Sequence, residues 1–525
     1  MKKFFKLQFL LLGFFLVVGT SMQAQNREFT HVKKISMNGV QAMKQNDVVV
    51  GYYAYFYVEK KDRKNFTFQL DIMDVNLKTT HKIKFTKPRR SILLETQFNG
   101  THFCFTYLDI KKKSLTSNIY DMNAKLTGTN VIEGLDRTSI QLLYQQQQLE
   151  EGYYSGTLIP IPNKGFAVAY TKKDSGLKVK IDMFNNKGKK KWTADSGVSK
   201  KAFEIFSPLY YSEDYLVGSI MTRPGRMSQK ITETVHIFDN KTGKLLGKVK
   251  TENAKAFFAV NGVDFDKDKG EFFMYGTKYG RKNKKPDFKH QLGLFVTYFS
   301  PKGTVSDKHF AFWGKDIMKK VKGKDKAKIK KGASVMLHNI TRTNTGKFVA
   351  VGELFNKEAS ALGIASKVLS KGQSNTSVAK VVLYNMLVFE FDEHFKTEKV
   401  SVIEKPKQNV QLPAGYGWVN EGKLGYILKA LGLFDFDFYT ANSDRSSFST
   451  VYTSYNRGKK GRNGNRYTIG VISLDEDGHV VSTKMSLKSK PTAFTVLPAK
   501  PGYVGVFEYF RKNKTAKIRI EKLDL

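Results

Sequence analysis

The sequence is poor in cysteine and in long hydrophobic runs. Its one cysteine is Cys104, which excludes an internal disulfide, so the stability of the chain must come from burial of apolar surface. Cys104 lies in a β-like run and is expected to be a small buried hydrophobe. It also lies too far downstream to carry the acyl chains of a lipoprotein. Beyond residue 24, no segment is apolar enough to cross a bilayer as a helix, so the mature chain is expected to be water-soluble.

Motifs of several enzyme classes are absent as well. The nine histidines include no His-Glu-x-x-His and no closely spaced pair, which excludes a local zinc signature. There is no Gly-x-Ser-x-Gly elbow, because Gly332, Ala333 and Ser334 lack the second glycine, and there is no Walker or dinucleotide glycine pattern. The sequence therefore predicts no cofactor, with calcium as the one alternative considered below.

The N-terminus has the three-part layout of a secretory signal peptide. Lys2, Lys3 and Lys6 precede an apolar stretch from Phe9 to Val18, which is followed by small and polar residues up to Ala24. We expect cleavage after Ala24, within one or two residues, and a mature chain that begins near Gln25. The sequence thus predicts export, with the periplasm favoured over the cell surface or the medium.

Positive charge dominates the composition. Lysine and arginine total 88 against 47 acidic residues, which gives a formal charge of +41. Such an excess favours anionic partners. For an exported protein these would be lipopolysaccharide phosphates, acidic glycans or anionic lipids, and no nucleic acid is expected.

A repeated pattern of β-runs and tight turns extends along the chain. One copy has runs at Leu158–Pro160, Phe166–Tyr170 and Val179–Phe184, with turns rich in Asn and Gly. The second run of each unit recurs at Val48–Tyr57, His102–Tyr107, Phe166–Tyr170, Tyr215–Met221, Glu271–Tyr275, Lys347–Leu354, Phe448–Tyr455 and Tyr503–Tyr509. The sequence predicts an all-β propeller of seven or eight four-stranded antiparallel blades over residues 25–525.

The two ends of the chain are expected to close this ring. The last unit stops after its third run, Ala516–Leu523, and the segment Phe29–Lys34 is the candidate for the missing strand. Two insertions interrupt the repeats. One covers about residues 313–332 and is dense in lysine. The other covers about residues 356–380, where Asn356 would cap a helix with Leu362, Ala365 and Leu369 on one face.

Two turns carry a family resemblance. Asp239 to Gly243 and Asn185 to Trp192 resemble the turns after the third strand in quinoprotein-type propellers, which commonly combine Asp, Thr, Gly and a following Trp. Trp follows in only one copy, so the resemblance supports the fold and does not imply a quinone cofactor. In overall style the chain is similar to uncharacterised exported proteins of Gram-negative bacteria.

The loops between second and third strands are basic in most units. Because strands alternate in direction, these loops must emerge on one face of a propeller, which predicts an anion-binding surface; solubility alone is the other interpretation. The clearest cations are Lys60, Lys61, Arg63, Lys64, Arg281, Lys282, Lys284, Lys285, Arg457, Lys459, Lys460, Arg462, Arg511, Lys512 and Lys514, and Lys111, Lys112, Lys113, Arg223 and Arg226 occupy equivalent loops.

Two groups of acids are candidate sites. Asp264, Asp266 and Asp268 alternate before Gly270 as in loose calcium loops, although a plain hairpin turn explains them too. Asp435 and Asp437 alternate with phenylalanines, so one strand would place both carboxylates on one face, roughly 6–7 Å apart. This spacing lies between those of retaining and inverting glycosidases, which makes the two aspartates candidate catalytic acids.

These patterns favour a non-catalytic binding or scaffold protein of the cell envelope, whose basic loop face meets an anionic glycan, lipid headgroup or acidic protein. The alternative is a propeller hydrolase or lyase that acts on a polysaccharide through the aspartates. A third possibility is an assembly factor that docks another protein through the repeat strands and residues 356–372.

Overall fold

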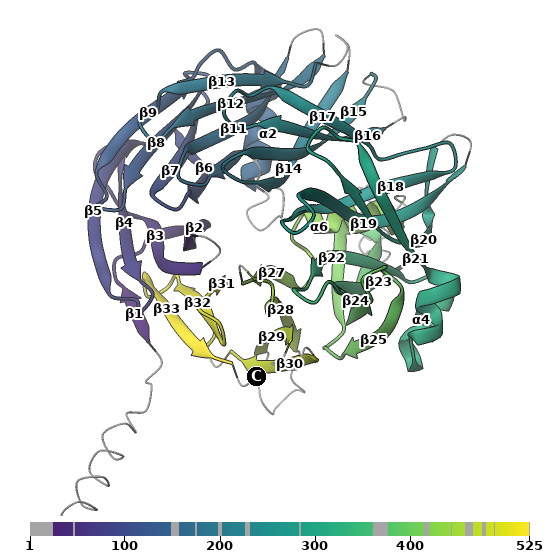
Figure 1. The fold of residues 1–525 in the computed structure, drawn as a ribbon. Helices are drawn as coiled ribbons and strands as arrows, with labels where there is room; N and C mark the ends of the chain where they lie inside the picture. The colour runs from purple at the N-terminus through teal and green to yellow at the C-terminus, as the bar shows by residue number, and fades with distance from the viewer. Residues whose placement is uncertain are drawn as a thin grey trace, which may run out of the picture.

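The computed structural model describes residues 25–45, 48–148, 157–173, 176–197, 202–225, 231–282, 285–360, 376–413, 419, 421–442, 444–456, 466–474, 479–487 and 489–523. The expected signal peptide, residues 1–24, lies outside them. The described strands form eight antiparallel blades of four main strands arranged in a ring (Figure 1). The prediction of an all-β propeller of seven or eight blades is confirmed, and the number is eight.

The first half of the ring contains blades 1 to 4. Blade 1 consists of β2 (Lys34–Gln45), β3 (Val48–Lys60), β4 (Asn65–Asp74) and β5 (Thr79–Pro88). Blade 2 consists of β6 (Ser91–Phe98), β7 (His102–Asp109), β8 (Ser114–Asp121) and β9 (Leu126–Ile132). Blade 3 consists of β10 (Leu158–Ile161), β11 (Gly165–Lys173), β12 (Leu177–Asn185) and β13 (Lys190–Asp195). Blade 4 consists of β14 (Phe203–Tyr211), β15 (Tyr215–Arg223), β16 (Thr232–Asp239) and β17 (Leu245–Lys250). A single parallel pairing, Leu177 with Phe203, links blades 3 and 4 into one sheet.

The second half contains blades 5 to 8. Blade 5 consists of β18 (Ala256–Asp266), β19 (Glu271–Lys282), β20 (Lys285–Phe299) and β21 (Val305–Phe312). Blade 6 consists of β22 (Ser334–Arg342), β23 (Phe348–Ala359), β24 (Thr376–Phe391) and β25 (Thr397–Ile403), with the short β26 (Gln408–Pro413) paired to β24. Blade 7 consists of β27 (Phe436–Ala441), β28 (Phe448–Asn456), β29 (Arg466–Leu474) and β30 (Val480–Ser486). Blade 8 consists of β31 (Ala493–Pro498), β32 (Tyr503–Phe510), β33 (Thr515–Lys522) and β1 (Asn26–Phe29).

The two ends of the described chain close the ring in blade 8. Strand β1 pairs antiparallel with β33, from Asn26 opposite Arg519 to Phe29 opposite Ala516. The closing strand therefore lies slightly before the predicted segment Phe29–Lys34. The reason is that β2 begins at Lys34, so the residues between Phe29 and Lys34 are needed as the connection from blade 8 to blade 1. Phe29 is buried against Phe56 of blade 1 and Phe507 of blade 8.

The core lies between neighbouring blades. The strands alternate and carry large side chains on both faces, so each blade packs against the next; Tyr53 of blade 1, for example, meets Phe103 of blade 2 edge-on at 5.2 Å between ring centroids. Cys104 of β7 is fully buried in this core. The eight predicted second strands coincide with β3, β7, β11, β15, β19, β23, β28 and β32, and only Lys347 of Lys347–Leu354 lies outside its strand.

Helices occur in the connections between blades. They are α2 (Arg137–Gln148) before blade 3, η1 (Trp313–Ile317), α3 (Met318–Lys320) and α4 (Gly323–Lys330) before blade 6, and α6 (Glu421–Ala430) before blade 7. No described helix has both the length and the apolar character needed to span a bilayer.

The predicted helical insertion at residues 356–380 needs correction at both ends. Asn356 is no helix cap, because it lies in β23 opposite Val382 of β24, and the pairing continues to Ala359 opposite Ala379. The residues from Asn356 onward are compatible with either a helix or a long hairpin. Their pairing with β24 makes them part of a strand. Leu362, Ala365 and Leu369 lie outside the described residues. The insertion at residues 313–332 contains η1, α3 and α4.

The loops of the ring fall on two faces. The first strands of successive blades lie beside one another, and each blade is antiparallel. The turns between second and third strands therefore share one face with the blade-to-blade connections; we call it the linker face. The turns between first and second strands, and between third and fourth strands, share the other, which we call the hairpin face.

Candidate functional site

A group of exposed cations lies on the linker face of blades 8, 1 and 2, which are consecutive in the ring (Figure 1). We call this group the basic arc. Its members are Lys33, Lys60, Lys61, Arg63, Lys64, Arg89, Arg90, Lys111, Lys112, Lys113, Arg511, Lys512 and Lys514. The structure thus brings together the predicted cations of the first and last units and adds those of the connections Lys33 and Arg89–Arg90.

Backbone hydrogen bonds fix the turns of the basic arc to the connections beside them. The N–H of Arg89 donates to the carbonyl of Lys64 at 2.8 Å, and the N–H of Val32 donates to the carbonyl of Lys514 at 2.8 Å. In blade 2 the N–H of Leu135 donates to the carbonyl of Lys113 at 3.0 Å. The three turns therefore hold their cations on a braced backbone.

Two lysines of the arc have a backbone conformation that lysine rarely adopts. Lys113 and Lys514 occupy equivalent places in the β7–β8 and β32–β33 turns, and both have φ of 54°. Glycine or asparagine is the usual residue in this left-handed region, because a Cβ there crowds the backbone. Two turns of the arc therefore keep a cation where an uncharged residue would fit the backbone better.

Among the described residues, no side chain of the basic arc forms an ion pair with a carboxylate, and this distinguishes the arc from several cations of the hairpin face. There, Lys164 pairs with Glu213 at 3.2 Å, Lys241 with Asp214 at 3.4 Å and Lys347 with Glu398 at 3.0 Å. The described linker face of blades 8, 1 and 2 therefore carries an excess of exposed cations outside ion pairs, with Asp62 and Asp109 as acids of the same turns.

The remaining predicted cations are placed differently or lie outside the described residues. Arg281 is held by Glu252, with 3.4 Å between Nη1 and Oε2, and donates to the carbonyl of Asn253. Lys282 is exposed at the end of β19. The predicted residues outside the described ones are Arg226, Lys284, Arg457, Lys459, Lys460 and Arg462, together with the side chain of Lys285.

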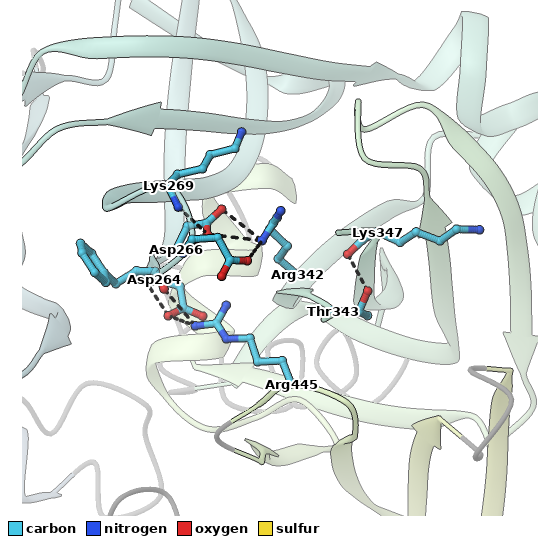
Figure 2. A network of polar contacts seen from close by, with 9 residues as sticks. Asp264, Asp266, Lys269, Arg342, Thr343, Lys347 and Arg445 are labelled. Carbon is cyan, nitrogen blue, oxygen red and sulfur yellow. Dashed lines mark hydrogen bonds and ion pairs between the residues drawn. The ribbon is translucent and has the colours of Figure 1, made fainter. Parts of the chain in front are cut away.

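Asp264, Asp266 and Asp268 lie at the β18–β19 hairpin, and Figure 2 shows Asp264 and Asp266 facing Arg445 and Arg342. Nη2 of Arg445 is 2.7 Å from Oδ1 of Asp264. Nη1 of Arg342 lies 3.2 Å from Asp266 and 3.3 Å from Asp268. Asp266 also accepts the N–H groups of Asp268 and Lys269, as a turn-forming aspartate does. These contacts join hairpins of blades 5, 6 and 7, and within the described residues no three His, Cys, Asp or Glu side chains form a group able to hold a metal ion.

Asp435 and Asp437 have separate environments. The prediction that one strand runs through both aspartates is wrong at its start, because β27 begins at Phe436. Asp437 lies at a bulge between Phe436 and Phe438. The bulge breaks the alternation that would place both carboxylates on one face. Asp437 accepts a hydrogen bond from the Thr453 hydroxyl at 2.7 Å.

Asp435 belongs to a buried ion-pair cluster between blades 6 and 7. Nζ of Lys405 lies 2.6 Å from Asp435 and 2.9 Å from Glu353, and the side chains of Lys405 and Glu353 are fully buried. Burial and the neighbouring Glu353 raise the pKa of Asp435 to about 7, while Lys405 opposes that shift. The ammonium group of Lys405 is thus the charge that both carboxylates share.

Two more titratable groups border this cluster. His338 stacks on Phe436 with ring centroids 4.5 Å apart, and burial holds its pKa well below the usual range, so its ring is neutral. Lys429 of α6 donates to the carbonyls of Leu337 and His338, each at 3.2 Å, and burial lowers its pKa to about 7. Lys429 therefore ties α6 to the innermost strand of blade 6.

Buried glutamates join other blades in the same way that Glu353 joins blades 6 and 7. Glu353 accepts the N–H of Asp435 at 3.1 Å. Glu95 of blade 2 accepts the N–H of Leu158 in β10 at 2.9 Å, and Glu233 of blade 4 accepts the N–H of Val260 in β18. The recurrence favours a structural role for Glu353, because each of these glutamates accepts an N–H from the innermost strand of the following blade or from the residue directly before it.

Sequence reasoning missed Glu353, Lys405 and Lys429, which come from three different segments of the chain. Glu353 lies inside an otherwise apolar part of β23, and this buried acid was the one feature of the sequence that could have indicated the cluster. The partners Arg342 and Arg445 of the β18–β19 aspartates were missed for the same reason, since their separation along the chain hides the contact.

Comparison with solved structures finds propellers and other large proteins at low similarity. A post-proline cleaving enzyme from Rickettsia typhi is 9% identical with a TM-score of 0.38, and the match covers 91% of this chain and 58% of that one. BamB from Moraxella catarrhalis is 10% identical with a TM-score of 0.25 over 62% and 96% of the two chains. Polysaccharide lyase Uly1 is 9% identical with a TM-score of 0.35 over 93% and 90%. Likeness at this level does not bear on function.

A search of curated proteins finds no match to this sequence. A family model matches residues 1–524, and it is described as a family of unknown function, DUF6770. Since the match spans nearly the whole chain, this protein belongs to the DUF6770 family.

Proposed function

We propose that this protein is an exported, non-catalytic binding or scaffold protein of the cell envelope, and that the basic arc holds an anionic partner. The observation that carries the proposal is that no arc side chain forms an ion pair with a carboxylate among the described residues, whereas Lys164, Lys241 and Lys347 of the hairpin face do. Like charges on one face repel one another, and an anionic ligand removes that repulsion.

The place of action is part of the proposal. Lys2, Lys3 and Lys6, the apolar stretch after them and the small residues before Gln25 support export, with the periplasm as the favoured compartment. The abundant anions of an envelope are phosphate-bearing lipids and acidic glycans, and acidic proteins are a further class. Mass determination of the protein purified from the envelope tests this step, and the expected N-terminal residue is Gln25 or one of its near neighbours.

The aspartates give less support to a hydrolase or lyase. A general acid must reach its substrate, and Asp435 is nearly buried and ion-paired with Lys405. Asp437 and Asp435 also contact different partners. The scaffold interpretation is therefore preferred to the enzymatic one.

The experiment that tests the proposed function compares two charge-reversal variants. In the arc variant Lys61, Lys112 and Lys512 become Glu; in the hairpin variant the exposed Lys78, Lys125 and Lys187 become Glu, which changes the net charge equally. Binding of each to lipopolysaccharide, an acidic glycan and anionic vesicles is measured at low and physiological salt. We expect the arc variant alone to lose binding. Equal loss in both variants, or no binding by the unaltered chain at physiological salt, would overturn the proposal.

A further inference from the structure

One apolar side chain is exposed within the basic arc. Ile110 opens the β7–β8 turn directly before Lys111, Lys112 and Lys113, and 46% of its surface is accessible. The turn is braced, since the Asp109 carboxylate accepts the N–H of Lys112 at 2.9 Å and Lys113 bonds to Leu135. Ile110 therefore projects from a fixed turn with three lysines beside it.

Two aromatic rings near the arc each lie under a cation. The Arg89 guanidinium lies over Phe66 at 5.8 Å, and Nζ of Lys87 lies over Tyr107 at 4.7 Å from the ring centroid. A sugar-binding surface usually offers aromatic faces and converging polar groups in a concave site. Here the arc cations stand on separate turns and the faces of Phe66 and Tyr107 are occupied by cations, which disfavours a glycan.

Cations spread over one face with an apolar residue among them suit the surface of an anionic bilayer. Phosphates of lipid headgroups lie in a plane, so turns of three neighbouring blades can reach them together. Each basic residue near such a surface adds a similar increment of attraction, and an aliphatic side chain gains by entering the boundary between headgroups and acyl chains. We propose that the protein binds anionic lipid bilayers peripherally through the basic arc, with Ile110 inserted into the interface. This inference rests on the proposed function and names its partner.

Vesicle sedimentation with the chain from Gln25 onward tests the inference. Vesicles of phosphatidylglycerol mixed with phosphatidylcholine are compared with vesicles of phosphatidylcholine alone, and immobilised heparin serves as an anionic glycan without a bilayer. We expect sedimentation only with phosphatidylglycerol, a steep decrease with added salt, and loss of binding in the Lys61, Lys112 and Lys512 to Glu variant. The Lys78, Lys125 and Lys187 to Glu variant should sediment like the unaltered chain.

Ile110→Ser separates lipid insertion from charge. It changes no charge and lies in an exposed turn, so thermal unfolding of the variant should match that of the unaltered chain. We expect a several-fold loss of vesicle binding at physiological salt and unchanged retention on heparin. An equal loss of vesicle binding and heparin retention, or no loss of vesicle binding, would contradict the insertion of Ile110 into the bilayer interface.

The outcomes also separate this inference from the proposed function. Binding to heparin that the arc variant loses, without binding to vesicles, would overturn the lipid inference and leave an anion-binding arc in place. Failure to bind either anion, or equal loss in both charge-reversal variants, would overturn both.

Discussion

Lys405 and Glu353 are buried together between blades 6 and 7, with 2.9 Å between Nζ and Oε1 and neither side chain accessible to solvent. Asp435 completes the contact at 2.6 Å from the same Nζ. A buried ammonium between two carboxylates holds the neighbouring blades in register, because removal of the cation would leave both acids without their shared counter-charge. The stability of this boundary therefore depends on Lys405.

Substitution of Lys405 by Met tests that dependence. Loss of one partner from a buried ion pair costs about 3–5 kcal/mol, so we expect a decrease of that order in the free energy of unfolding. Lys407→Met is the matched control: Lys407 is half exposed and lies 3.9 Å from Glu358, so its loss should cost about 1 kcal/mol or less. Urea unfolding followed by tryptophan fluorescence measures both. Similar small effects for the two variants would contradict a structural role for the cluster.

Glu233 gives the fold a predictable response to pH. It is fully buried, and burial raises its pKa from 4.5 to about 7. In the unfolded chain the carboxyl loses its proton near pH 4.5, whereas the folded chain keeps the proton up to about pH 7. The contribution of Glu233 to stability is therefore present below pH 4.5 and is lost as the pH rises to 7. We expect the unaltered chain to lose on the order of 3 kcal/mol relative to Glu233→Gln across this interval.

Parallel denaturant titrations of the unaltered chain and Glu233→Gln at several pH values measure this difference. Glu59→Gln, at the exposed end of β3, is the surface control. A constant difference between the unaltered chain and Glu233→Gln from pH 4 to pH 8 would show that Glu233 titrates normally.

Lys113 provides a way to separate folding from binding. Its φ of 54° costs a lysine roughly 1–2 kcal/mol, and glycine avoids that cost but has more freedom to lose on folding. We expect Lys113→Gly to raise the free energy of unfolding by up to about 1 kcal/mol and still to weaken anion binding. Lys112→Gly removes the same charge from a turn position without positive φ, and should lower stability by about 0.5–1 kcal/mol.

Thermal unfolding and vesicle sedimentation of the two glycine variants measure these opposite effects. A lower free energy of unfolding in Lys113→Gly would contradict this account, because it would show that Lys113 stabilises the turn itself.

The sequence was sufficient for the strands because they follow simple local rules. Phe166–Tyr170 and Glu271–Tyr275 are short apolar runs between turn residues, and each became a second strand. Closure by the N-terminal segment could be predicted too, since Ala516–Leu523 left one blade a strand short. The position of that strand was off by a few residues because pairing with β33 competes with the start of β2.

Helix α6 could not be predicted, because its glycine content disfavours a helix and contacts with other parts of the fold stabilise it. Gly422 and Gly425 lower helix propensity, but both are required by packing. A Cβ at Gly422 would lie 2.3 Å from the carbonyl oxygen of Phe288, and one at Gly425 would lie 2.8 Å from the ring of Phe355. The glycines allow the helix to approach β20 and β23, which the sequence alone does not reveal.

The candidate site was predictable in kind and less so in extent. Lys60–Lys64 and Arg511–Lys514 stand out as basic turns, and the antiparallel repeat places them on one face. An ion pair can join segments that are distant in the sequence. The sequence therefore could not distinguish Arg281, which Glu252 holds, from Lys112, whose side chain forms no ion pair among the described residues. The same limit hid the arginines opposite Asp264 and Asp266 (Figure 2).

Lysine footprinting tests the central claim, that the basic arc is the anion-binding surface, most directly. The chain from Gln25 onward is acetylated briefly with and without phosphatidylglycerol vesicles and, separately, heparin, and mass spectrometry quantifies each lysine. We predict that Lys61, Lys112 and Lys512 are protected by at least one of these anions, while Lys164, Lys241 and Lys347 on the hairpin face react as in the free protein. Protection that is equal on the two faces, or confined to the hairpin face, would contradict the assignment of function to the basic arc.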